Sequence, residues 1–234
     1  MRKLILGAAV ALAACAQHHQ MTKVDDSGLA RLDERQMQPV DDARVEEGRA
    51  QDAIAKAKAA ESDARARFEV ARSEKDVSEA QLKRSIAERD LLKKQYASKD
   101  QLAQADQNIQ AAQDRVKATD LKLAYLNQMI AVAEGERKAA EAHFSTAHFV
   151  TEQSKYRAMR AANAPQAEAV NVGEIDKQVA EARANEAHAQ KAAADQRSKA
   201  VSLYNRWEQV DASARTMAQP HNLPVPPPMS EPSK

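Results

Sequence analysis

Aromatic residues, glycine and cysteine are all scarce in this sequence. Its 234 residues include one Trp, four Tyr, three Phe, five Gly and a single Cys. So few aromatic residues do not build a compact globular core, and a lone cysteine has no partner for an internal disulfide. Ala, Gln, Glu, Lys and Arg dominate instead. That composition is typical of long helices with a coiled-coil pattern.

Motifs that carry catalytic or ligand-binding chemistry are also missing. The sequence contains no nucleotide-binding loop, no CxxC pair and no HExxH motif, and it offers no Ser-His-Asp set. Adjacent His18 and His19 lack the further ligands that a specific metal site needs. His143 and His148 lie about 140° apart around a helix, so they do not bind one ion together. We therefore expect no enzyme activity, no catalytic residue, no cofactor and no metal site.

Neither sign of charge dominates the chain. Of the 35 Lys and Arg residues, Arg2 and Lys3 belong to the N-terminal leader, which leaves 33 against 34 Asp and Glu residues. This balance gives no electrostatic reason to expect nucleic acid as a partner.

The first residues have the layout of a secretory signal peptide. A short basic start is followed by an apolar run at 5–14 that ends in small residues. The run is too short to span a bilayer, which takes about 20 residues. Its end, Leu12-Ala-Ala-Cys15, resembles the lipobox of bacterial lipoproteins. That resemblance implies removal of 1–14, transfer of diacylglycerol to the Cys15 sulfur, and acylation of the new amino terminus by a fatty acid such as palmitate.

Lipid on Cys15 sets the expected location. Each buried methylene contributes about 0.8 kcal/mol, so several acyl chains hold a protein firmly to a leaflet. In lipoproteins of this kind an Asp after the cysteine marks retention in the inner membrane, and here that position is Ala16. The resemblance therefore implies the periplasmic face of a bacterial outer membrane.

Apolar residues repeat with alternating steps of three and four along most of the remaining chain. In the middle they are Leu102, Ala105, Ile109, Ala112, Val116, Thr119, Leu123, Leu126, Ile130 and Ala133. The repeat continues in 175–217 and is weaker in 50–92, where Glu61, Lys75 and Arg89 interrupt it. This spacing predicts helices wound on each other. We expect an all-α fold, an elongated antiparallel coiled-coil helical hairpin plus a third long helix.

Proline, glycine and capping residues divide the chain. We expect a disordered lipidated tether at 15–38, the hairpin at 39–163, the third helix at 174–218 and a disordered Pro-rich tail at 219–234. The hairpin turn is predicted near 95–100, because Ser98 is a good N-cap and Gln101 completes a capping box. Arms of about 80–90 Å follow from 1.5 Å per residue.

The region of the predicted turn resembles a known one. Leu91-Leu-Lys-Lys-Gln-Tyr-Ala-Ser98-Lys-Asp-Gln-Leu-Ala-Gln-Ala105 is similar to the hairpin tip of periplasmic adaptor (membrane fusion) proteins of efflux and secretion systems. The resemblance covers about 40 residues and implies docking onto an outer-membrane channel. Leu91 and Ser98 occupy the family's Leu and Ser positions, with Tyr96 beside them. The family's Arg position is Ala87, and the chain stays helical where the adaptor's flanking domains begin.

Two points stay open in the sequence. If the third helix packs back on the hairpin, Trp207 lies on its seam near the tip. If that helix runs on separately, Trp207 is an exposed anchor for a partner. The sequence likewise leaves homo-oligomer formation undecided.

The expected function is structural. We expect a lipoprotein that projects a coiled coil into the periplasm as a spacer, scaffold or docking partner for another protein. One alternative is an adaptor-like accessory of an efflux or secretion channel. A second is a peptidoglycan-tethering lipoprotein, because the anchored cysteine, the heptads and Lys234 resemble the murein lipoprotein, whose C-terminal lysine is joined to the wall.

Overall fold

Three long helices make up most of the described part of the protein. The computed structural model describes residues 23–218, with side chains to residue 212. The helices are α1 (Glu34–Lys94), α2 (Lys99–Ala161) and α3 (Val172–Ala218), with the short 3-10 helices η1 (Asp26–Arg31) and η2 (Pro165–Ala169). The part of the chain that the structure describes contains no strand. The predicted all-α class is confirmed.

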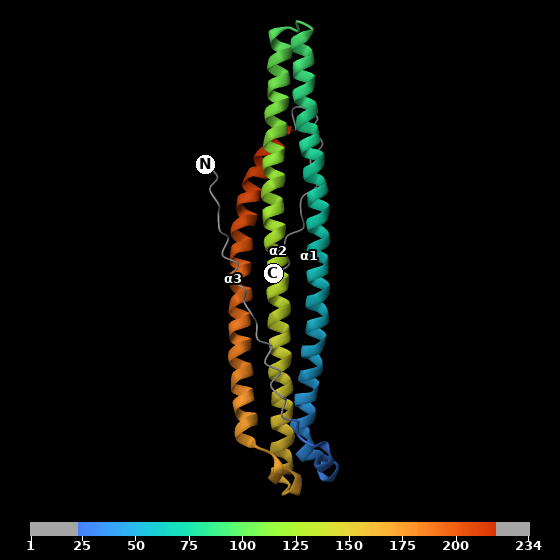
Figure 1. The fold of residues 1–234 in the computed structure, drawn as a ribbon, viewed down its shortest axis with the longest axis vertical. Coiled ribbons are helices and arrows are strands. Elements are labelled where there is room, and N and C mark those ends of the chain that lie inside the picture. The colour runs from blue at the N-terminus through green and yellow to red at the C-terminus, as the bar shows by residue number, and fades with distance from the viewer. Residues whose placement is uncertain (1–22, 219–234) are drawn as a thin grey trace, which may run out of the picture.

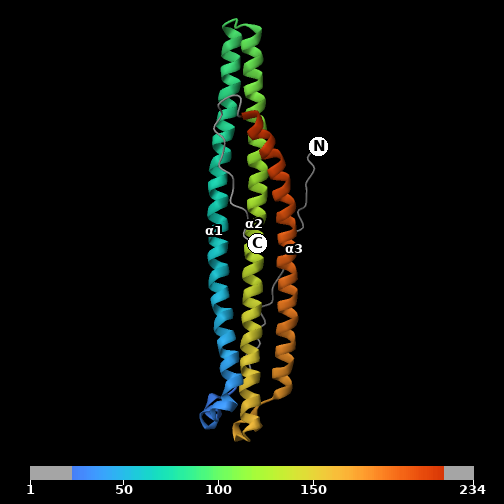
Figure 2. The same ribbon diagram turned by 180° about the vertical axis from the view of Figure 1, so that it is seen from behind.

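Helix α2 lies between the other two (Figures 1 and 2). Its contacts with α1 pair rising residue numbers with falling ones, as in Glu61–Arg137 and Arg89–Asp106, so the two helices are antiparallel. Helix α3 packs on the other side of α2 and runs back toward the α1–α2 turn, but ends before reaching it (Figure 1). At 1.5 Å per residue, α2 is about 95 Å long. The molecule is a rod with the α1–α2 turn at one end.

Helix α1 begins at Glu34, not at residue 39, so the expected tether boundary at 38 is wrong. Asp33 is the N-cap, and its side chain accepts a hydrogen bond from the Gln36 backbone while the Gln36 side chain accepts one from Asp33. Pro39 therefore sits inside the helix rather than at its start. The capping box at Asp33 and Gln36 pairs two backbone amides at the helix start. The helix therefore begins there, ahead of Pro39. Part of the predicted disordered tether is also ordered, as η1.

Small residues form the α1–α2 seam, and charged residues cross it. Ala64, Ala71 and Ser78 are buried on α1, which lets the two helix axes approach closely. The residues that interrupt the α1 heptads are explained by ion pairs with α2. Their N···O distances are Glu61–Arg137 2.8 Å, Lys75–Asp120 2.6 Å and Arg89–Asp106 3.0 Å.

Trp207 fixes α3 to α2. Its ring is stacked on Tyr125 at a centroid distance of 6.4 Å, and its side chain is only 5% exposed. Tyr204 adds an edge contact to Tyr125 at 5.4 Å. Of the two alternatives for Trp207, the structure has the packed one. Farther along, a Cβ on Gly135 would stand 3.3 Å from the Ala193 Cα, so the absence of a side chain lets these helices approach closely.

The largest buried side chains gather at the end of the rod far from the α1–α2 turn, which we call the base. Met159, Ile175 and Val40 are almost fully buried there, together with Val24 from the N-terminal segment. Helices η1 and η2 close this end. None of the described helices is long and apolar enough to cross a membrane.

Candidate functional site: the hairpin tip

Both ends of α2 are bordered by the same helix-ending turn. At the α1–α2 turn, the Ala97 amide donates to the Leu92 carbonyl at 3.1 Å and the Tyr96 amide donates to the Lys93 carbonyl at 3.3 Å. At the base, Ala164 donates to Met159 at 2.9 Å and Asn163 to Arg160 at 3.1 Å. These are the two hydrogen bonds of a Schellman motif. The same backbone arrangement thus occurs twice, once before α2 and once after it.

The two turns differ in the residue at the left-handed position. Tyr96 and Asn163 both have φ of 54° and are the only described non-glycine residues with positive φ. This conformation disfavours side chains other than Gly, Asn and Asp, at a cost of about 1–2 kcal/mol. Asn163 follows that preference, whereas Tyr96 violates it. Backbone strain of this kind that persists in a structure points to a functional reason.

The Tyr96 ring does not contribute to the fold. Its side chain is 96% exposed at the far end of the rod, so packing does not offset the backbone strain. One turn before it, Leu91 is 54% exposed, while neighbouring Leu92 is partly buried toward α2. An aromatic and an aliphatic side chain therefore stand free at the apex. We call the segment 91–99 the tip.

Ser98 has a different role from these two residues. Its hydroxyl oxygen accepts a hydrogen bond from the Gln101 amide at 3.2 Å, and the Gln101 side chain accepts one from the Ser98 amide at 2.9 Å. This capping box starts α2 immediately after the turn. Of the three predicted docking residues, Leu91 and Tyr96 present free apolar surface, and Ser98 holds the turn that presents them.

The N-terminal segment joins the rod at the base. The Val24 amide donates to Glu152 Oε2 at 2.6 Å, and Lys155 Nζ lies 2.8 Å from the other oxygen of Glu152 and 2.9 Å from Asp26. Burial lowers the pKa of Lys155, but hydrogen bonds to Glu152 and Asp26 raise it by more, so its pKa lies above the usual value. Glu152 is 53 residues from Lys99 along α2, about 80 Å. The described part of the chain therefore begins at the base, far from the tip.

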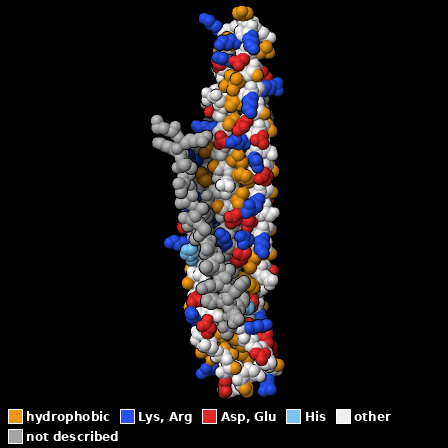
Figure 3. All heavy atoms as spheres, viewed as in Figure 1, with side chains coloured by type: hydrophobic (Ala, Val, Ile, Leu, Met, Phe, Trp, Pro, Cys, Tyr) orange, Lys and Arg blue, Asp and Glu red, His pale blue; other side chains and the backbone are white. Residues whose placement is uncertain are grey.

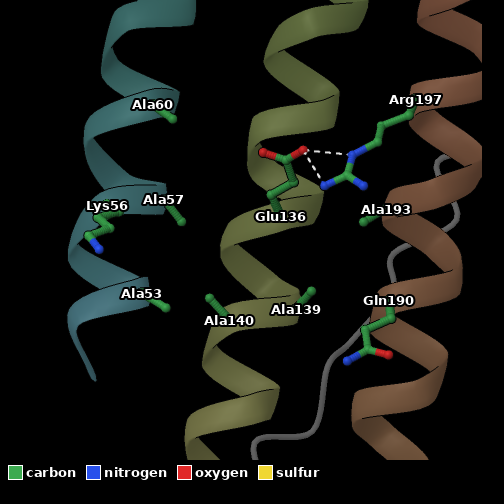
Figure 4. A pocket seen from close by; sticks show the side chains of 10 residues that line it. All are labelled: Ala53, Lys56, Ala57, Ala60, Glu136, Ala139, Ala140, Gln190, Ala193 and Arg197. Carbon is green, nitrogen blue, oxygen red and sulfur yellow. Dashed lines mark hydrogen bonds and ion pairs between the residues drawn. The ribbon is translucent and has the colours of Figure 1, made fainter. Parts of the chain in front are cut away.

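A shallow groove runs between α1 and α3 over α2 (Figure 4). It has a volume of about 410 Å³ and is lined mainly by alanines, among them Ala57, Ala140 and Ala193. Two of the charged residues that line the groove, Arg197 and Glu136, form an ion pair with each other at 2.7 Å. Among the side chains that the structure describes, residues 23–212, no three or more His, Cys, Asp or Glu residues form a group that could hold a metal ion. Because six of the ten residues that line this groove are alanines, we place the candidate site at the tip.

The two separated histidines are seam residues. His143 Nδ1 lies 2.9 Å from Glu186 of α3, and its Nε2 lies 3.5 Å from Glu46 of α1. His148 lies 2.8 Å from Glu47 of α1. Each histidine thus connects α2 to a neighbouring helix and forms no shared site with the other.

Several predicted residues lie outside the described part of the chain. These are Cys15, His18 and His19 on one side and Lys234 on the other. Sequence reasoning also missed the buried Glu152–Lys155 pair; its only local signal is an acid and a base three residues apart.

Comparison with protein-family models, with curated proteins and with solved structures gives no match for this chain.

Proposed function

We propose that the protein is a lipid-anchored periplasmic lipoprotein whose coiled-coil hairpin is a spacer that presents the tip to a partner protein. The observation that carries the docking part of this proposal is Tyr96, which is strained, almost fully exposed and placed at the apex; the anchor rests on the lipobox resemblance that ends at Cys15. A spacer alone needs no aromatic side chain at its end, and a stable turn needs Asn or Gly. Contact with a partner protein would explain why a tyrosine occupies this position.

The proposed anchor fits the polarity of the rod. Cys15 precedes Val24 by nine residues, which span at most about 30 Å when fully extended. Lipid on Cys15 in the outer membrane would therefore keep the base close to that membrane. The tip would stand about 80 Å or more farther into the periplasm. A partner reached in this way is a protein away from the anchoring leaflet.

A second candidate is an adaptor-like accessory of an efflux or secretion channel. The exposed Leu91 and Tyr96 favour it, since they lie in the stretch that resembles adaptor tips. Under this candidate the partner is an outer-membrane channel, and Tyr96→Asn should reduce export. Normal export in that variant would remove the candidate and leave the more general docking function intact.

Docking is tested by photo-crosslinking in cells. A photoreactive residue at position 91 should capture an envelope protein, and the same residue at Val45 should not capture it. Leu91 and Val45 are both 54% exposed, so they differ in place rather than accessibility. Capture from position 91 should fall about tenfold or more in Tyr96→Asn. Equal capture from both positions, or no effect of Tyr96→Asn, would contradict docking through the tip.

The anchor is tested separately. Mass spectrometry of the mature amino terminus should find an acylated Cys15, and the protein should fractionate with the outer membrane. Cys15→Ser should release it from that fraction. An unmodified Cys15 or cleavage elsewhere would overturn the proposed location.

A further inference from the structure

A second residue at the tip conflicts with local helix physics. Lys99 is the first residue of α2, where the helix dipole is positive and cations are disfavoured. Two other elements begin with an acidic residue, α1 with Glu34 and η1 with Asp26. Asp100 partly restores the preference in the same turn. At this position the Lys99 charge is unfavourable for the start of α2, just as the positive φ of Tyr96 is unfavourable for the turn.

Lys99 is one of three exposed lysines around Tyr96. Lys93 and Lys94 lie in the last turn of α1, where the helix dipole favours cations. All three lysines are within three positions of Tyr96 in the sequence. No described side chain forms an ion pair with any of the three. The neighbouring Arg89, in contrast, is paired with Asp106 at 3.0 Å. Basic side chains and apolar surface stand together at the apex in Figure 3.

We propose that the tip binds a protein pocket that is apolar at its centre and carries carboxylates on its rim. Tyr96 and Leu91 enter the apolar centre, and Lys93, Lys94 and Lys99 meet the acidic rim. This inference rests on the docking function proposed above and names the chemistry of the partner. An aromatic anchor surrounded by charges that fix orientation is the usual arrangement of a protein interface centre and rim.

The geometry favours a protein over a lipid surface. The hydrogen bonds of the turn fix the backbone that carries Tyr96, so its side chain leaves the rod in one set direction, which suits a pocket of fixed position. A fluid headgroup layer needs no such fixed geometry. Rim charges mainly raise the association rate and the specificity, and their effect weakens with salt. The proposed contact should therefore depend on ionic strength.

The test uses the full chain with a photoreactive residue at position 91. The triple variant Lys93→Glu/Lys94→Glu/Lys99→Glu should reduce capture about tenfold or more, and the corresponding Gln variant less. The matched control, Lys58→Glu/Lys83→Glu/Lys138→Glu, makes the same change in net charge at exposed lysines away from the tip and should leave capture unchanged. Because Lys99→Glu removes an unfavourable dipole contact, this single variant should melt no lower than the parent, and reduced capture in it reflects lost docking rather than misfolding.

The outcomes distinguish the two levels of the proposal. Capture that persists in the Glu variant, or that does not fall between 0.05 and 0.5 M salt in isolated envelopes, overturns the acidic rim while docking stands. A crosslinked adduct with the mass of a lipid overturns it in favour of a membrane surface. No capture by the parent overturns docking and rim together. Crosslinked partner peptides that contain Asp or Glu, with capture lost on charge reversal, support the proposal.

Discussion

Replacing Tyr96 by Asn should stabilise the protein while it weakens docking. The left-handed conformation costs a non-glycine residue about 1–2 kcal/mol, and Asn avoids part of this cost. Because the ring is 96% exposed, its removal loses no packing. The expected net gain is about 0.5–1 kcal/mol. For a chain of this size, that raises the melting temperature by about 1–4 °C.

Thermal unfolding followed by circular dichroism at 222 nm measures the global gain. Hydrogen exchange measures the local one, because the Tyr96 and Ala97 amides are the donors of the turn. Their exchange should slow about two- to fivefold, the factor that corresponds to 0.5–1 kcal/mol. The reciprocal variant, Asn163→Tyr, introduces the same strain at the exposed base position and should destabilise by a similar amount. A less stable Tyr96→Asn protein, or a more stable Asn163→Tyr protein, would refute the strain argument.

Two further predictions concern the contacts between the helices. Hydrogen bonds from Arg65 and Arg137 hold the pKa of Glu61 below its usual 4.5. The stabilisation by Glu61 is therefore full above that value and is lost as the pH falls through the lowered folded value. Melting curves from pH 6 to pH 3 should show this loss in the parent and less of it in Glu61→Gln; an equal loss in both would contradict it. Gly135→Leu should push α3 away from α2 at a cost of about 1–3 kcal/mol and shift Trp207 fluorescence to the red. Gly48→Leu, whose Cβ would meet nothing within 4 Å, should do neither, and a red shift there would undermine the packing account.

Local sequence predicts the position of the tip but not the strain within it. Ser98 and Gln101 form a capping box that can be recognised from their spacing, and α2 begins directly after it. The strain at Tyr96 has no comparable signal. A left-handed turn residue is normally Gly or Asn, so a tyrosine at that position does not suggest one. Its exposure also depends on where α3 ends, and no residue near Tyr96 encodes that.

The polar residues of α1 show the opposite limit. Glu61, Lys75 and Arg89 weaken the heptad pattern when α1 is considered alone, because a heptad score treats every charged residue at the seam as a fault. In the structure each of them pairs with a charge on α2. The partner residues are 17 or more positions away along the chain, so only the alignment of the two helices brings them together.

Sequence alone determined the all-α class, because the three-four spacing of apolar residues is a local property of a helix face. It also located the turn near Ser98, since capping is satisfied within a few residues. Only the tertiary structure decided that α2 lies between α1 and α3, that Trp207 is buried against Tyr125, and that Glu152 binds the N-terminal segment at the base. These depend on contacts between distant residues, and an apolar helix face specifies that it must be covered without specifying by which helix.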